Sequence, residues 1–225
     1  MMSLLSGAGL VMPALHYQQQ LKRLVLKSYL RYEKMEIKGR TQVVTPPTTE
    51  PLTLSELKNH LRIDGSFDDA LLNSCITSAR MYFESQCEIS IASQTLLLAL
   101  DYFDDIIYLP KGPVQSVQDI SYADSKNIAQ DMDDWIEDLV SNPARITPAF
   151  GDSWPATADV VNAVEVSYTT GYANANLVPK LLKSGMLFYA AHLYENRSAV
   201  TDGDLKEVPM AVESIIQQYT TGIYH

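Results

Sequence analysis

Apolar residues follow a helical period towards both ends of the chain and a strand-like period between them. In residues 66–87, Leu72, Ile76, Ala79 and Phe83 recur every three or four positions, which buries one face of a helix. Between about residues 93 and 170, apolar residues come in short runs separated by Pro, Gly, Asn and Asp. This pattern predicts an α+β fold, in which an N-terminal helix pair and C-terminal helices enclose a small, mostly antiparallel β module.

Capping signals predict the limits of the N-terminal helix pair. Thr53 and Glu56 have the spacing of a capping box, which opens a short helix to about Leu61. Ser66 is expected to cap the long helix that runs to about Cys87.

Two prolines open the predicted C-terminal helices, because proline suits a first helical turn. Pro179 and Pro209 occupy these positions, and Gly222 is expected to end the last helix. The apolar faces of the two helices are Leu182, Met186, Tyr189 and Leu193 in the first, and Val212, Ile215, Ile216 and Tyr219 in the second.

Five short segments of the middle region are rich in Val, Ile, Leu and Tyr and are predicted to be strands. A further segment, 131–139, is predicted to add one or two helical turns. The predicted strands are 95–100, 106–109, 116–122, 144–147 and 160–168.

The first 45 residues differ in charge from the rest of the chain. They hold seven Lys/Arg and two acidic residues, whereas residues 46–225 hold ten Lys/Arg and 25 acidic residues. Residues 16–34 have the pattern of a basic amphipathic helix. We therefore expect a basic extension (1–45) followed by a main domain (46–225) with its β module at about 93–170. Either the extension contacts a partner or DNA, or translation starts at Met35 and the preceding residues are upstream sequence.

The overall charge limits the classes of partner. A net charge of −10 argues against a protein that grips DNA through a basic face. No apolar run reaches the length of a membrane span. Cys75 and Cys87 stand twelve residues apart on one predicted helix, roughly 18 Å, which is too far for a disulfide.

The sequence has no common catalytic or metal-binding motif, so it indicates neither an enzyme nor a cofactor site. The chain has no phosphate-binding loop, no nucleophile elbow and no HExxH sequence. His192 and Glu195 share a helix face, but a surface or subunit contact explains them better than a metal site. We therefore predict a protein without catalytic, cofactor or metal residues.

An acidic run is the densest charge feature of the sequence. One interpretation is a solvated surface. The other is a negatively charged channel wall, which repels phosphates so that DNA passes without specific binding. The residues of the run are Asp131, Asp133, Asp134, Glu137 and Asp138.

Several segments, in this order, resemble the phage head–tail connector (adaptor) family of long-tailed bacteriophages. The similarity covers about residues 50–220, and residues 1–45 have no counterpart in it. The segments are Pro51-Leu-Thr-Leu-Ser-Glu-Leu-Lys58, His60-Leu-Arg-Ile-Asp64, Asp68-Asp-Ala-Leu-Leu72, Leu109-Pro-Lys-Gly-Pro-Val114 with Ser116-Val117, Arg145-Ile146 with Ser153-Trp154-Pro155, Val166-Ser-Tyr-Thr-Thr-Gly-Tyr172, Val178-Pro179 and Tyr194-Glu-Asn-Arg197.

The resemblance implies a structural virion protein at the head–tail junction, assembled in the host cytoplasm. It implies a homo-oligomeric ring, roughly twelve-fold to match the portal, with the portal on one side, a head-closure or tail protein on the other and no membrane contact. Two alternatives stay open: a head-closure or tail-completion protein of the same neck, and a small enzyme or DNA-packaging factor.

The C-terminal helix and tail are the candidate portal contact, because aromatic and apolar anchors are typical of interface hot spots. The residues proposed for it are Ile215, Tyr219, Ile223 and Tyr224. For Ile215 and Tyr219, the alternative is that they close the subunit's own helical core.

Overall fold

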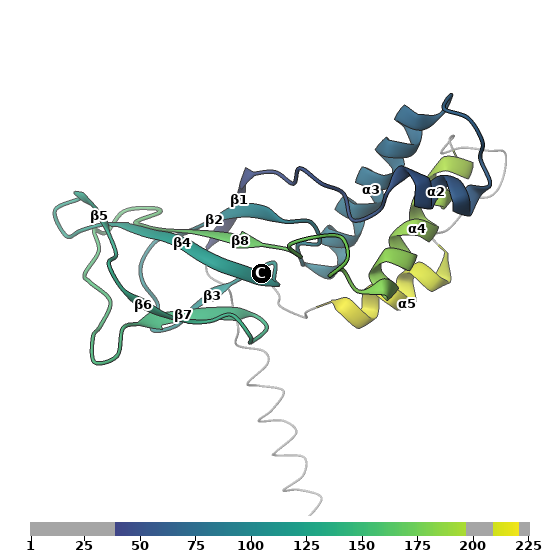
Figure 1. Ribbon diagram of the computed structural model, residues 1–225. Helices are drawn as coiled ribbons and strands as arrows, with labels where there is room; N and C mark the ends of the chain where they lie inside the picture. The colour runs from purple at the N-terminus through teal and green to yellow at the C-terminus, as the bar shows by residue number, and fades with distance from the viewer. Residues whose placement is uncertain (1–38, 197–208, 221–225) are drawn as a thin grey trace, which may run out of the picture. The chain divides into compact units, whose positions relative to one another are not determined.

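Helices and sheets form two separate apolar cores in the computed structural model, which describes residues 39–196 and 209–220 (Figure 1). The α+β class predicted from the sequence is confirmed. The amphipathic helix predicted at 16–34 lies outside the described residues, as do Arg197 and Gly222. The helices of the described part are α2 (Leu54–Leu61), α3 (Asp69–Cys87), α4 (Lys180–Glu195) and α5 (Met210–Tyr219).

The helices start close to the predicted signals. The side-chain oxygen of Thr53 accepts a hydrogen bond from the Glu56 amide at 3.2 Å, and the Thr53 amide donates to the Glu56 carboxylate at 2.7 Å, which confirms the capping box. The long helix begins at Asp69, and its N-cap is Asp68 rather than the predicted Ser66.

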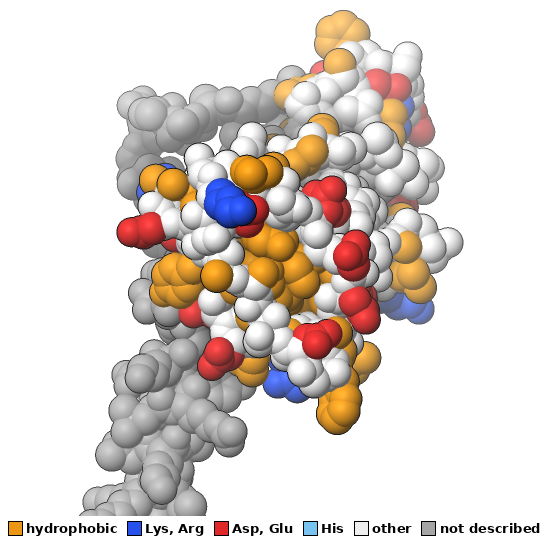
Figure 2. Space-filling model, turned by 90° about the vertical axis from the view of Figure 1, so that its left-hand side faces the viewer, with side chains coloured by type: hydrophobic (Ala, Val, Ile, Leu, Met, Phe, Trp, Pro, Cys, Tyr) orange, Lys and Arg blue, Asp and Glu red, His pale blue; other side chains and the backbone are white. Residues whose placement is uncertain are grey.

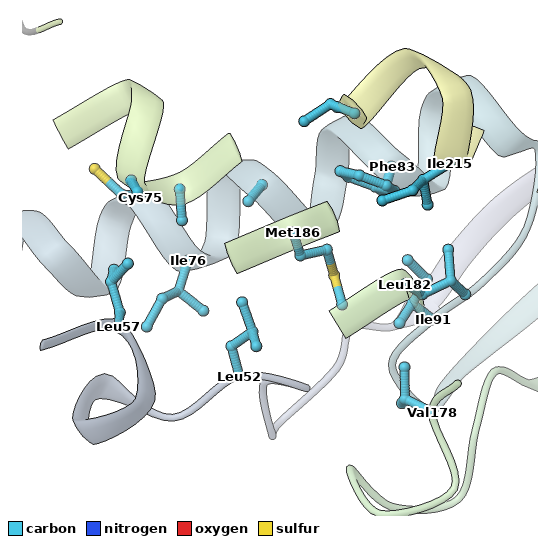
Figure 3. Close-up of a cluster of buried hydrophobic side chains, with 14 of the residues drawn as sticks. Leu52, Leu57, Cys75, Ile76, Phe83, Ile91, Val178, Leu182, Met186 and Ile215 are labelled. Carbon is cyan, nitrogen blue, oxygen red and sulfur yellow. The ribbon is translucent and has the colours of Figure 1, made fainter. Parts of the chain in front are cut away.

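The helical core buries the apolar stripes that the sequence predicted. Ile76 and Phe83 of α3 face Leu182 and Met186 of α4, and Ile215 of α5 joins them (Figure 3). Gly185 has a structural role here, because a Cβ at this position would lie 2.7 Å from the Phe83 ring. Both cysteines are buried and free, and burial raises the pKa of the Cys87 thiol to about 11.

A five-stranded and a three-stranded antiparallel sheet enclose the second core (Figure 1). Leu96 and Leu98 pair with Tyr168 and Val166, so the buried residues of β2 and β8 share one face. The Tyr168 hydroxyl donates to the carbonyl of Pro110 at 3.0 Å. In spatial order the larger sheet contains β1 (Arg40–Thr45), β2 (Gln94–Leu100), β8 (Val164–Thr170), β4 (Val114–Ala123) and β5 (Ala129–Asp131), and the smaller one β3 (Ile107–Leu109), β7 (Ala144–Pro148) and β6 (Trp135–Asp138).

The β part differs from the small inserted module that the sequence suggested. All five predicted strands are present, with ends shifted by up to a few residues, but β1, β5 and β6 are additional. The strand β1 precedes the helices and pairs with β2, so the helices do not simply flank the sheet. The prediction of helical turns at 131–139 is wrong, because Trp135–Asp138 is a strand paired with β7.

The proposed boundary between extension and main domain remains a prediction. The strand β1 falls within the stretch assigned to the extension, yet its hydrogen bonds to β2 make it part of the larger sheet. Charge composition did not reveal this, because a strand on a sheet edge needs no distinctive charge.

Candidate assembly surfaces

A buried ion cluster joins the helical core to the larger sheet. Arg80 of α3 is 7% exposed; its Nε donates to Glu50 at 2.8 Å and its Nη1 to Glu84 at 2.7 Å. The second Glu84 oxygen accepts the amides of Ile91 at 2.8 Å and Ala92 at 3.2 Å. These contacts raise the pKa of Arg80 against the opposing effect of burial. Arg80 thus connects the segment before α2, the helix α3 and the start of β2.

Backbone hydrogen bonds around Gly171 also stabilise the junction between the helical core and the larger sheet. Gly171 follows β8 with φ +93°, and its amide donates to the Pro113 carbonyl at 2.8 Å. The next residue, Tyr172, donates to Ile91 and forms a parallel bridge with Ala92. Gly171 therefore makes the turn after β8 and holds the ends of two strands together.

The acidic run divides into structural and solvent-facing residues. Asp138 accepts hydrogen bonds from Ser141 and from Arg145 at 2.9 Å, and Glu137 accepts the Trp135 indole N–H at 2.9 Å. Asp131, Asp133 and Asp134 are exposed at the end of β5 and in the following loop. Glu137 is exposed as well, whereas Asp138 is half-buried.

The pKa of Asp138 gives a testable pH dependence. Hydrogen bonds from Ser141 and Arg145 lower it to about 2, below its usual value near 4. A lowered pKa in the folded state adds stability above the unfolded pKa, and this stability is lost as the pH falls through about 2. We expect Asp138→Asn to lower the melting temperature at pH 7, by an amount that shrinks towards pH 2. Melting curves at pH 7, 4 and 2 check this, and a difference that is constant with pH contradicts it.

Aromatic side chains pack together against the core of the β part. Phe103 stacks on Trp154 with ring centroids 4.7 Å apart and meets Tyr122 edge-on at 5.6 Å. Figure 2 views the molecule from the left-hand side of Figure 1. It shows hydrophobic side chains gathered on this face, with Asp and Glu side chains around them. Trp154 thus packs against the second core.

The candidate portal residues do not form one exposed group within the described structure. Ile215 is buried in the helical core, and Tyr219 packs against that core. For these two, the structure favours the alternative that they close the subunit's own core. Ile223 and Tyr224 lie outside the described residues.

The histidine noted in the sequence has ordinary surroundings. The His192 ring stacks near Tyr189 and lies 3.2 Å from the Asn196 amide. Across residues 39–196 and 209–220, no group of three or more His, Cys, Asp or Glu is arranged to hold a metal ion. None of the described helices is long and apolar enough to cross a membrane.

Comparison with known proteins gives one family match. Residues 51–144 match the family model described as phage gp6-like head–tail connector protein. Over this segment the chain is similar to the phage gp6-like head–tail connector family. The resemblance seen in the sequence is confirmed over these residues, which hold α2, α3 and the first half of the β part. A connector family is structural, in agreement with the prediction that the protein is not an enzyme.

Solved structures extend the likeness of the connector fold beyond the family segment. A chain in the neck of an empty gene transfer agent (GTA) particle computed with C6 symmetry superposes with a TM-score of 0.68 at 24% identity, covering 83% of this chain and 96% of that one. A chain in the virion of the native GTA particle gives 0.67 at 24%, covering 82% and 96%. A chain in the native neck computed with C12 symmetry gives 0.65 at 22%, covering 83% and 96%. The chain matches none of the curated proteins.

Proposed function

We propose that the protein is an adaptor subunit of the virion neck, forming a ring between the portal and the head-closure or tail proteins. The observation that carries this proposal is the connector-family match over residues 51–144. The fold likeness to a neck chain over 83% of this chain supports it, because it extends beyond the 94 residues that the family model matches. The symmetries of those necks, C6 and C12, are consistent with a closed ring of this subunit.

The charge distribution suits a subunit beside a DNA channel. Asp131, Asp133 and Asp134 are exposed and have no cationic partner in the contacts of the described residues. Facing a channel, they repel the DNA backbone and prevent it from adhering during ejection. We assign to them the channel-facing role, and to Ile223 and Tyr224 at the chain end the portal contact.

Electron microscopy of the purified protein with and without its portal tests the proposal. We expect closed rings seated on one face of the portal, formed either by the protein alone or only on that template. The unrelated protein lysozyme, mixed with portal at the same concentration, is the negative control. Binding only to the far side of a preformed neck indicates a head-closure protein instead, and failure to bind either contradicts the proposal.

A further inference from the structure

The outer face of α3 carries no charged residue. The charged side chains of this helix are all buried or partly buried and take part in ion pairs. Asp69 pairs with Lys58, and Arg80 pairs with Glu84. A surface helix ordinarily has its charged residues on the solvent side. The exposed positions of α3 are Ala70, Leu71, Asn73, Ser74, Ser78, Met81, Ser85 and Gln86.

Five of these residues form a straight stripe. Their spacing alternates between three and four residues, the spacing of a helix seam that packs against another helix. Met81 is 59% exposed, and the Ser74 hydroxyl already donates to the carbonyl of Ala70 at 3.0 Å. Covering this stripe therefore costs little desolvation, since it contains no ion and its polar groups are small. The stripe, in order, is Leu71, Ser74, Ser78, Met81 and Ser85.

A second stripe lies on α4, and its exposed side chains are large and apolar where those of α3 are mostly small. Leu181 and Phe188 are each 40% exposed and stand seven residues apart. The Phe188 ring lies beside the His60 ring, with centroids 5.8 Å apart and the planes tilted by 48°. Both helices bury their inner faces in the same helical core, so their outer faces point away from it and from each other.

We propose that the α3 stripe of one subunit packs against the α4 stripe of the next, forming the contact between neighbours in the ring. This inference rests on the proposed function and identifies the surfaces that build the ring. Large side chains on α4 match small ones on α3: Leu181 and Phe188 are about 10 Å apart, as are Ser78 and Ser85. Because the two faces differ, the contact is head-to-tail, which a closed ring requires.

Other occupants fit this face less well. DNA needs cations, and the α3 stripe has none. Depletion of charge with exposed Met and Leu is instead typical of the centre of a protein interface. The face is roughly 28 Å long and 10 Å wide, so one such contact is smaller than the ~800 Å² per partner of a stable pair. An isolated pair of subunits is therefore weak, and ring closure or a template is needed.

Crosslinking with a bis-maleimide tests which surfaces meet. The double variant Ser78→Cys/Phe188→Cys should give a ladder of species above the dimer in portal-bound rings. Each single variant should give no ladder, because each contact then has one reactive thiol; the native cysteines are buried. A ladder absent from rings that do form overturns the inference, and dimers from Ser78→Cys alone overturn the head-to-tail pairing.

A charge exchange tests the contact by its energetics. Ser78→Lys and Phe188→Glu should each reduce ring yield on the portal at least about tenfold, and the double variant should recover much of it. Ser116→Lys, at an exposed position of β4, is the control and should assemble normally. Melting temperatures of the variants verify folding. Rings that form undiminished with Ser78→Lys overturn this inference alone, whereas a wild-type protein that never forms rings overturns the proposed function as well.

Discussion

Replacement of Arg80 by alanine is expected to lower the free energy of unfolding by about 3–5 kcal/mol, the usual cost of removing one partner from a buried ion cluster. The Glu84 side chain is only 13% exposed and is also held by the amides of Ile91 and Ala92. It therefore cannot turn towards water when Arg80 is lost. Its uncompensated charge remains buried, and the junction between α3 and β2 loosens.

Chemical denaturation of Arg80→Ala and Arg145→Ala measures this effect against a matched control. Arg145 pairs with a single carboxylate, that of Asp138, at 2.9 Å, and its side chain is 45% exposed. An exposed pair contributes little to stability, because solvent screens it, so the control should lose far less stability. Hydrogen exchange at Ile91 and Ala92 should accelerate only in the Arg80 variant. Equal losses in the two variants contradict a structural role of the cluster.

Helix positions could be predicted from the sequence because their signals are local. The capping box at Thr53 depends on one residue three positions away, and the stripe from Leu72 to Phe83 depends on helical spacing alone. The sheet order β1-β2-β8-β4-β5 could not be predicted, because it joins segments far apart in the chain. The segment 131–139 was assigned wrongly because the strand β6 has only four residues and its burial does not alternate between buried and exposed.

Interaction surfaces were harder to predict than the fold. The sequence drew attention to dense charge at 131–138, but Asp138 and Glu137 satisfy local hydrogen bonds. It missed the α3 face, whose signal is an absence of charge at exposed positions. That signal was available, since the alternation of Leu71, Ser74, Ser78 and Met81 is visible in the sequence. Recognising this alternation as an exposed surface, however, requires knowing which side of the helix faces solvent.

Substitution of Gly171 by alanine is expected to be about as damaging as loss of Arg80, because it strikes the backbone of the same junction. A Cβ here would lie 2.2 Å from the Ala92 carbonyl oxygen and 2.6 Å from its carbon, and neither atom can move without parting Ala92 from Tyr172. The positive φ of +93° adds strain of its own for any residue with a side chain. We expect a loss of roughly 3 kcal/mol or more.

Gly65→Ala separates the two causes of this loss. Gly65 has a similar φ of +88°, but nothing lies within 4 Å of the position that a Cβ would take. The control therefore carries the backbone strain without the clash and should cost about 1–2 kcal/mol. Denaturation curves give the free energy of unfolding of each variant, and the difference between the two losses is the cost of the clash. Failure of Gly171→Ala to fold while Gly65→Ala folds also shows that the clash is costly. If both variants lose the same stability, the close approach of Gly171 to Ala92 does not hold the sheet to the helical core.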